Sequence, residues 1–331
     1  MEHRFLGSTG VRLSRLALGA MSFGDAADEA EAGRMFARCV DAGVNHVDTA
    51  DVYSRGRSEE IVGRLIKACR DRVVLASKAY FPTDKGDPNA RGTSRYHLVR
   101  SVEASLRRLG TDRIDLFYLH RFDDETALDE TLRAVDDLVR AGKILYPAVS
   151  NFAAWQVAKA LGVAARLGFA PVVCVQPMYN LVKRQAEVEI LPMCLSERVG
   201  AIVYSPTAGG LLTGKYSAAA RPSAGRLVDN PMYRVRYADD RYYDVAGRFG
   251  EMAAARGVHP AALAVAWVAS HPAVTSVLLG GRSLAQLEPT LGALDVVIDD
   301  ELRAALDALS PPPPPATDRN EERSAHNFGR R

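Results

Sequence analysis

Four ionisable side chains stand where short apolar runs end, and their types suit the transfer of a proton: Asp48, Lys78 and His120, with Tyr53 five residues beyond Asp48. A tyrosine hydroxyl is a weak acid with a pKa of about 10, and an adjacent ammonium group lowers that pKa. A carboxylate would hold the ammonium group in place, and an imidazole would bind a substrate oxygen. The set predicts Tyr53 as a general acid that Lys78 and Asp48 tune toward neutral pH, with His120 orienting the substrate.

Each of these residues also has an ordinary structural use when taken singly. An aspartate forms turns or caps helices, a lysine at a strand end is solvated, and a histidine often belongs to a core or its rim. The functional interpretation gains weight because the residues follow consecutive predicted strands around one rim. The sequence offers no better supported Ser-His-Asp set, and no His, Cys and Glu cluster at the spacing of metal ligands, so we expect no metal.

The elements that must position these residues alternate between short apolar runs and longer amphipathic ones. The predicted strands are 16–18, 44–48, 72–77, 113–120, 144–150, 172–176, 201–205 and 274–279. The predicted helices are 30–42, 58–68, 94–109, 128–141, 153–167, 185–198, 245–256, 261–270 and 283–291. Eight strands, each followed by helix, predict an α/β fold with a single closed (β/α)8 TIM barrel, whose active site lies at the C-terminal ends of the strands.

The chain ends are predicted to lie outside this repeat. Residues 5–7 and 11–13 flank a turn and predict an N-terminal β-hairpin, within residues 1–15, that caps the bottom of the barrel. We expect one barrel domain over residues 1–309 and a loosely ordered tail over 310–331, which begins with five prolines. The stretch 206–240, rich in Gly, Pro and Arg, is predicted to be irregular.

Composition excludes several classes of protein. The chain has 331 residues and a net charge of +2, which leaves no basic footprint for nucleic acid. No apolar run approaches the roughly 20 residues that a bilayer requires, and the N-terminus lacks the features of a signal peptide. The four cysteines are scattered and show no C-x-x-C spacing, which predicts buried thiols in a reducing cytoplasm.

Three further patterns have simpler interpretations. The run 209–215 nearly spells a phosphate-binding P-loop, but Tyr216 stands where a Ser or Thr would bind magnesium. No G-x-G-x-x-G follows the first strand, which argues against a doubly wound dinucleotide-binding fold. The arginine-rich stretch 95–113 is interpreted as the solvated face of a helix.

Several motifs of the chain resemble those of one enzyme family. They are DTADVY at 48–53 with Gly56, Ser58 and Glu59, Lys78 in ASK, His120 in YLH, VSNF at 149–152, QPMYN at 176–180, YSP at 204–206 and LLTGK at 211–215. Together they resemble the aldo-keto reductases, and the resemblance runs from residue 5 to about 294. It implies a (β/α)8 barrel that reduces small-molecule aldehydes or ketones to alcohols with NADPH. In that family the tyrosine, here Tyr53, is the proton donor, assisted by Lys78 and Asp48, while His120 positions the carbonyl group.

The resemblance also implies which residues bind the cofactor and the substrate. Ser150, Asn151 and Gln176 would hold the nicotinamide carboxamide, Tyr204 would stack on the ring, and Arg282 would grip the 2′-phosphate. The implied cofactor contacts are Gly19, Ala20, Met21, Asp48, Ser150, Asn151, Gln176, Tyr204, Ser205, Pro206, Thr207, Ala208, Gly210, Lys215, Arg226, Gly280, Arg282 and Gln286. The implied substrate pocket is formed by Met21, Phe23, Tyr53, Phe81 and His120. The chain departs from the family pattern at Thr207-Ala208, and at Pro289-Thr290 near the adenine.

Two alternatives stay open on the sequence. Some relatives of this pattern are regulatory proteins that bind the cofactor, act as ion-channel subunits and turn over little. Others reduce keto-sugars. The sequence does not distinguish a monomer from a homo-oligomer, and it predicts neither a nucleic-acid nor a membrane partner.

Overall fold

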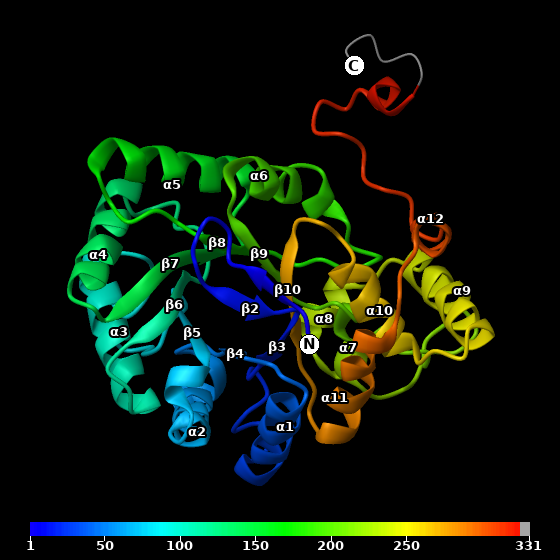
Figure 1. Ribbon diagram of the computed structural model, residues 1–331, viewed down its shortest axis with the longest axis horizontal. Coiled ribbons are helices and arrows are strands. Elements are labelled where there is room, and N and C mark those ends of the chain that lie inside the picture. Colours follow the sequence, from blue (N-terminus) through cyan, green and yellow to red (C-terminus); the bar gives the residue numbers. More distant parts are fainter. Residues whose placement is uncertain (325–331) are drawn as a thin grey trace.

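Eight parallel strands close into a barrel in the computed structural model, which describes residues 1–324. They are β3 (Leu16–Gly19), β4 (His46–Asp48), β5 (Val74–Ala79), β6 (Ile114–Leu119), β7 (Ile144–Ser150), β8 (Cys174–Gln176), β9 (Gly200–Val203) and β10 (Val274–Leu279). Strands that follow one another in the chain lie side by side, and β10 pairs with β3 to complete the ring. The predicted (β/α)8 barrel is therefore confirmed (Figure 1).

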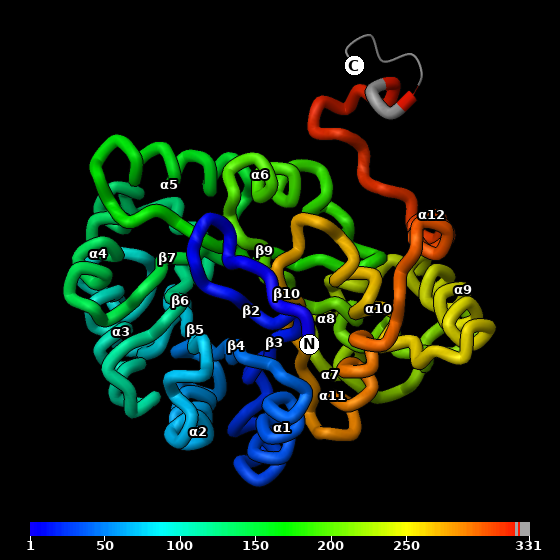
Figure 2. The backbone as a smooth tube through the Cα atoms, in the orientation of Figure 1, coloured from blue at the N-terminus to red at the C-terminus, as the bar shows by residue number. Residues whose placement is uncertain are grey.

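Helices surround the barrel on its outside (Figures 1 and 2). They are α1 (Glu29–Asp41), α2 (Arg57–Ile66), α3 (Arg95–Leu109), α4 (Leu128–Arg140), α5 (Ala154–Leu167), α6 (Ile190–Glu197), α9 (Arg241–Ala255), α10 (Pro260–Ala269) and α11 (Leu284–Leu291). Local signals set their ends, because Asp28 and Ser94 accept backbone N–H groups at the starts of α1 and α3. Gly110 ends α3 in a left-handed conformation.

The barrel strands are buried and mostly apolar because helices cover the outside and side chains fill the inside. Every residue of β6 and β10 is buried. The N-terminal hairpin of β1 (His3–Phe5) and β2 (Arg12–Ser14) contributes Leu6 and Leu13, both fully buried, to the cluster inside the barrel. Gly7 of this hairpin lies against the backbone at the start of β9, so the hairpin closes the end of the barrel where the strands begin, as predicted.

Three helices were not expected from the sequence. The stretch 206–240, predicted to be irregular, contains α7 (Arg226–Asp229) and α8 (Pro231–Arg236), and α12 (Asp300–Asp307) follows the barrel. The side chain of Asn230 accepts the N–H groups of Met232 and Tyr233 at the start of α8. Asp299 accepts the N–H of Leu302 in the same way. The missed signals were therefore an asparagine and an aspartate that cap short helices.

The chain leaves the barrel after α12 and runs outward (Figure 1). Leu309 and Ser310 are still buried, whereas most residues from 311 to 321 are exposed, and a single 3-10 turn spans Asn320–Arg323. The last part of the predicted tail, residues 325–331, lies outside the described residues.

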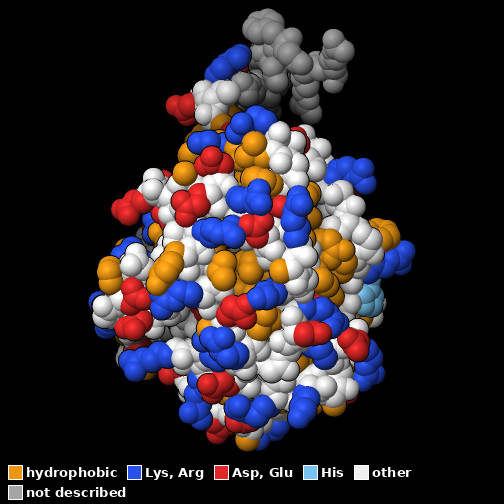
Figure 3. All heavy atoms as spheres, turned by 90° about the vertical axis from the view of Figure 1, so that its left-hand side faces the viewer, with side chains coloured by type: hydrophobic (Ala, Val, Ile, Leu, Met, Phe, Trp, Pro, Cys, Tyr) orange, Lys and Arg blue, Asp and Glu red, His pale blue; other side chains and the backbone are white. Residues whose placement is uncertain are grey.

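Basic and acidic side chains are interspersed over the face in Figure 3, in keeping with a net charge near zero. Within residues 1–324 no single helix is long and apolar enough to cross a membrane. Within this described part, α9 and α10 together have the length and composition for a span, but they are bent by 100° at the break between them.

Candidate active site

The C-terminal ends of the barrel strands bring the predicted site residues to one rim. Gly19 ends β3, Asp48 ends β4, Ser150 ends β7 and Gln176 ends β8. The backbone registers of neighbouring strands pair Gly19 with Asp48 and Ser150 with Gln176, so these residues stand at one level. Parallel strands in a closed ring place their ends together, and residues distant in sequence therefore share one site.

Asp48 and Lys78 form a buried ion pair at the centre of this rim. Lys78 donates to a carboxylate oxygen of Asp48, and its side chain is fully buried. Its ammonium nitrogen also donates to the carbonyl of Thr49 at 3.0 Å. The other oxygen of Asp48 accepts the amide of Gln176 at 2.9 Å. Both carboxylate oxygens are thus satisfied, as a buried charge requires.

Tyr53 lies at the start of a tight 3-10 turn, Tyr53–Gly56, directly before α2. Lys78 Nζ lies 3.5 Å from the Tyr53 hydroxyl, at the outer limit of a hydrogen bond, and 5.1 Å from the centre of its ring. Ser54 and Arg55 within the turn have positive φ angles of 48° and 57°. Left-handed backbone at such residues costs about 1–2 kcal/mol each, so the surrounding structure must hold this turn.

Burial shifts the pKa values of Tyr53 and Lys78. Burial raises the pKa of Tyr53 well above its ordinary value, and the charge of Asp48 raises it further. Burial lowers the pKa of Lys78, while the attraction of Asp48 opposes that change. The predicted lowering of the Tyr53 pKa toward neutral pH is therefore not seen, because burial and the charge of Asp48 both raise it. At neutral pH the phenol keeps its proton.

His120 faces the same space as a neutral imidazole. Burial and the charge of Lys78 hold its pKa well below the ordinary value for histidine. Its Nδ1 atom has no hydrogen-bond partner among residues 1–324. The ring makes edge contacts with Tyr53, at 5.8 Å between centroids, and with Phe81, at 5.0 Å. A neutral imidazole beside the phenol can donate or accept one hydrogen bond without adding charge.

A wall of polar side chains continues from His120 around the rim. Asn151 donates to the His120 carbonyl at 2.9 Å and to the Ser150 hydroxyl at 3.1 Å. The Tyr204 hydroxyl donates to the Asn151 side-chain oxygen at 2.8 Å. Ser150 donates to the carbonyl of Gln176 at 2.9 Å. The four residues expected to contact the nicotinamide therefore lie together in one hydrogen-bonded group.

Two cations lie in the segments assigned to the cofactor phosphates. Positive φ angles at Ser205, Ala208 and Gly210 turn the chain tightly after β9. A Cβ atom at Gly210 would meet only the end of the Lys215 side chain, at 3.9 Å. Neither Lys215 nor Arg282 has an ion-pair partner within residues 1–324, and Arg282 is exposed. The backbone N–H of Arg282 donates to the side-chain oxygen of Gln286 at 3.0 Å.

The placement of the remaining expected contacts is mixed. Met21, Lys215 and Gly280 are exposed, and Thr207 and Gly210 are partly exposed, so all of them can meet a ligand. Pro206 is buried. The guanidinium of Arg226 stacks over the ring of Tyr233, at 5.2 Å from its centre.

Three further expected contacts have side chains that are fully buried in the protein. Phe23 was expected in the substrate pocket, but its side chain is fully buried, because a turn after β3 folds it into the core through a bond from its N–H to the Ala20 carbonyl. Ala20 and Ala208, expected to touch the cofactor, are fully buried as well. Phe23 serves the site indirectly, since its carbonyl accepts the Ser54 hydroxyl at 2.8 Å.

Some residues around the site were overlooked in the sequence. Asn180 donates to the Ser205 carbonyl at 3.0 Å and to the Tyr237 hydroxyl at 3.3 Å, which steadies the chain after β9. Its place in the QPMYN motif was the available signal. Arg108, assigned to a solvated helix face, instead forms an ion pair with the fully buried Glu59, and the helical pattern alone contained no sign of this partner.

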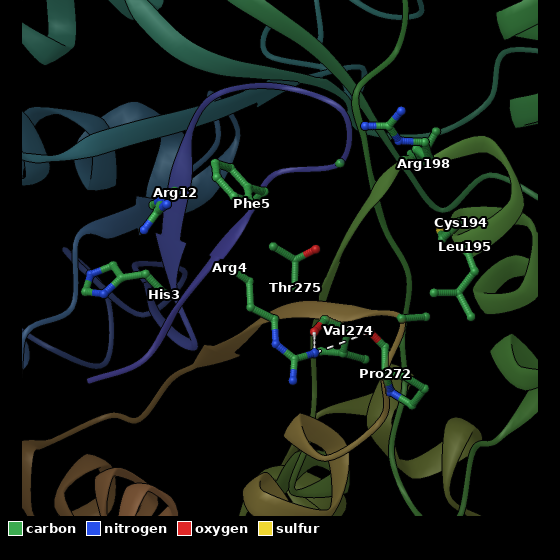
Figure 4. Close-up of a pocket in the computed structure, with 13 residues that line it drawn as sticks. His3, Arg4, Phe5, Arg12, Cys194, Leu195, Arg198, Pro272, Val274 and Thr275 are labelled. Carbon is green, nitrogen blue, oxygen red and sulfur yellow. Dashed lines mark hydrogen bonds between the residues drawn. The ribbon is translucent and has the colours of Figure 1, made fainter.

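A separate pocket of about 460 Å³ lies at the opposite end of the barrel. It is lined by the β1–β2 hairpin, the end of α6 and the chain that leads into β10 (Figure 4). Arg4 in this pocket donates to the carbonyl groups of Pro272 and Val274. The pocket is thus remote from the ionisable residues at the strand ends.

Comparison with known proteins identifies the family. The model of the Aldo/keto reductase family matches residues 15–311. The chain is 37% identical to "Uncharacterized oxidoreductase YrpG" of Bacillus subtilis, over 95% of this chain and 97% of that protein. It is 37% identical to the Arabidopsis thaliana protein named "Probable voltage-gated potassium channel subunit beta", over 90% of this chain and 92% of that protein. It is 35% identical to versiconal hemiacetal acetate reductase of Aspergillus parasiticus, over 82% of this chain and 86% of that protein.

The barrel, the strand-end residues and these similarities define an oxidoreductase scaffold. The chain belongs to the aldo/keto reductase family.

Proposed function

We propose that this protein reduces aldehydes or ketones to alcohols with NADPH, and that Tyr53 is the proton donor. The observation that carries the proposal is the meeting of Tyr53, Lys78, Asp48 and His120 at the C-terminal end of the barrel. Reduction of a carbonyl group consumes one hydride and one proton. The arrangement supplies one group that can give the proton and one that can bind the carbonyl oxygen.

The residues present fit a nicotinamide cofactor. Amide and hydroxyl groups of Gln176, Ser150 and Asn151 suit a carboxamide, because each can donate or accept a hydrogen bond. Lys215 and Arg282, which have no ion-pair partner within residues 1–324, suit its phosphate groups, and the planar guanidinium matches a phosphate with two parallel bonds. When bound, NADPH supplies the hydride.

The protein's own part in the reaction is to deliver a proton and to stabilise the charge that develops. A phenol with its ordinary pKa of about 10 already holds its proton at neutral pH, and burial raises the pKa of Tyr53 further, so the acid form is present when the carbonyl oxygen becomes basic. The fully buried Lys78 places a positive charge beside the phenol and stabilises the phenolate once the proton has left. Asp48 keeps that ammonium group charged and in position.

His120 orients the carbonyl group in this proposal. Because its pKa is lowered, the imidazole is neutral and offers a single hydrogen bond without a competing proton transfer. Its ring lies between Tyr53 and Phe81, so an oxygen bound to it is close to the phenol. Phe81 adds an apolar side to the substrate space.

The substitution Tyr53→Phe tests the proposal. It removes the proton and leaves the ring, so we expect kcat for carbonyl reduction to fall by about 10²-fold or more. Tyr80→Phe is the matched control, because Tyr80 is also partly buried and packs on Phe81 at 5.2 Å. NADPH oxidation with a panel of aldehydes, quinones and keto-sugars gives the rates. Wild-type kcat in Tyr53→Phe would refute the assignment of the proton donor.

The choice of NADPH over NADH is tested at Arg282. Removal of the guanidinium by Arg282→Ala is expected to raise KM for NADPH by about tenfold or more and to leave KM for NADH unchanged. An equal effect on both cofactors would mean that Arg282 does not read the 2′-phosphate.

A regulatory role is the second candidate, and the similarity to a protein named as a channel β subunit favours it. Such a protein would bind the cofactor and turn over little. Steady turnover with a carbonyl substrate supports the reductase, whereas tight NADPH binding without turnover across the panel supports the regulatory candidate.

A further inference from the structure

The turn that carries Tyr53 has a strained backbone. Ser54, Arg55 and Gly56 follow one another with φ angles of 48°, 57° and 88°. Residues other than glycine rarely adopt this backbone conformation. Strain of this kind persists only where neighbouring groups enforce it. The groups that enforce it therefore also set where the Tyr53 hydroxyl lies.

Arg108 on α3 supports this turn from behind. A Cβ atom at Gly56 would lie only 2.7 Å from Arg108 Cδ, so the arginine side chain packs directly against the glycine. Arg108 Nε donates to Glu59 at 2.6 Å, and its terminal nitrogen lies 3.4 Å from the Ser105 hydroxyl. The arginine is thus held in contact with the turn by its ion pair.

Glu59 connects this arginine to the strand that carries Lys78. Its side chain is fully buried near the start of α2. One oxygen accepts Arg108, and the other accepts the hydroxyl of Ser77 at 2.5 Å. Ser77 directly precedes Lys78 on β5. A single carboxylate therefore joins α2, which follows the turn, with α3 and with β5.

We propose that Glu59 and Arg108 are positioning residues that set the distance between the Tyr53 hydroxyl and the Lys78 ammonium group. This inference rests on the proposed function of Tyr53 as the proton donor. The separation of 3.5 Å stands at the limit of hydrogen bonding, so a small displacement of the turn abolishes the contact. Neither positioning residue is required to touch the substrate.

The simpler alternative is that this buried ion pair serves stability alone. Ser77→Ala separates the two, because it keeps both charges and removes only the connection to β5. Glu59→Gln removes the charge with little change of shape, and Arg108→Met keeps much of the stem. Glu60→Gln is the matched control, since Glu60 is the exposed neighbour of Glu59 on α2.

The first measurement is kinetic. We expect kcat to fall by about 10-fold to 10²-fold in Glu59→Gln and several-fold in Ser77→Ala, with KM for NADPH within about twofold of wild type. The pH dependence of kcat is expected to shift, because the interaction between the phenol and the ammonium group changes. Glu60→Gln is expected to match wild type. A purely structural role would lower the folded fraction and leave kcat per folded molecule and the pH profile unchanged.

The second measurement does not depend on turnover. The Arg55 side chain is exposed and accessible to trypsin, but the bond that follows it lies within the tight turn. Trypsin can therefore cut this bond only when the turn opens. Cleavage there is expected to be about tenfold faster in Glu59→Gln and Arg108→Met than in wild type and Glu60→Gln. Cleavage after the exposed Arg319, in the tail that follows the barrel, serves as the internal reference.

The outcomes separate the two proposals. An inactive wild-type protein would refute the reductase function, and the cleavage rates would then decide the positioning role alone. Normal kcat in Glu59→Gln and Ser77→Ala together with unchanged cleavage after Arg55 would overturn the positioning role. If Arg108→Met does not fold, Glu59→Gln and Ser77→Ala still decide whether the positioning role holds.

Discussion

Asp51 is a buried acid whose removal should change how stability depends on pH. Its side chain lies two residues before Tyr53 and is 3% exposed. Neither carboxyl oxygen makes a hydrogen bond of standard geometry within residues 1–324, although the Val52 N–H and the Ser101 hydroxyl lie near enough to lower its pKa slightly. Burial raises its pKa to about 8, the nearby charge of Glu59 raises it as well, and Arg108 opposes both. Asp51→Asn replaces this group by one of the same size that cannot ionise.

The magnitude follows from the two pKa values. In the unfolded chain an aspartate has a pKa of about 3.9, so between about pH 4 and about pH 8 the native protein holds a proton that the unfolded chain has lost. A raised native pKa gives stability that is complete at low pH and is lost as the pH rises through this window. Wild type should lose about 1.4 kcal/mol per pH unit from this group, relative to Asp51→Asn. Burial of the asparagine amide in Asp51→Asn changes the free energy of unfolding by an amount that does not vary with pH.

Urea unfolding at several pH values between about 5 and about 8 measures this difference. The fluorescence of Trp267, which is fully buried on α10, reports the folded state. We expect the unfolding free energy of Asp51→Asn to gain steadily on that of wild type as the pH rises. Asp25→Asn, at an exposed position, is the control and should follow wild type. A difference for Asp51→Asn that stays within about 0.5 kcal/mol across this range would refute the reasoning.

Three further predictions follow from other contacts. Lys78→Met leaves the Asp48 carboxylate buried with the Gln176 amide as its remaining donor, so urea unfolding should show a loss of about 3–5 kcal/mol; full stability would contradict the role of the ion pair. Gly63→Ala places a Cβ atom 2.3 Å from a backbone oxygen of α3 and should cost about 1–3 kcal/mol, whereas Gly33→Ala, which meets its nearest atom at 3.7 Å, should be neutral or stabilising in the same assay. Because burial holds the pKa of His120 low, kcat/KM should not decline near about pH 6.5, and a pH–rate profile checks this.

Much of the barrel was predictable because its signals are local. Apolar runs marked the buried strands, and helix periodicity marked the outer helices, so the eight strand–helix units could be counted along the chain. Some observed boundaries differ from the predicted ones because the residues next to a strand can have the same apolar pattern. Strand β5 begins and ends two residues later than predicted, at Val74 and Ala79. The predicted helix 185–198 divides into a 3-10 turn, Gln185–Glu187, and α6. The short helices α7, α8 and α12 were missed because few turns carry little periodicity, and only α8 and α12 begin with a side chain that caps the helix.

The candidate site divides in a similar way. Asp48, Lys78 and His120 could be placed on one rim, because each stands at or next to the end of a strand and the fold brings strand ends together. The burial of Phe23 could not be foreseen, because a turn stabilised by Ser54 and the Ala20 carbonyl decides which way that side chain points.

The sequence by itself determined which residue types stand at the strand ends, and hence the barrel, the family and the candidate proton donor. Only the tertiary structure decided their electrostatics. Whether the pKa of Tyr53 falls or rises depends on the balance between burial and neighbouring charges, and in the folded protein burial and the charge of Asp48 raise it. It also decided that Glu59 reaches Arg108 and Ser77, which lie 49 and 18 residues away in the chain. Distance and desolvation belong to the folded arrangement, and both act between residues that the sequence keeps far apart.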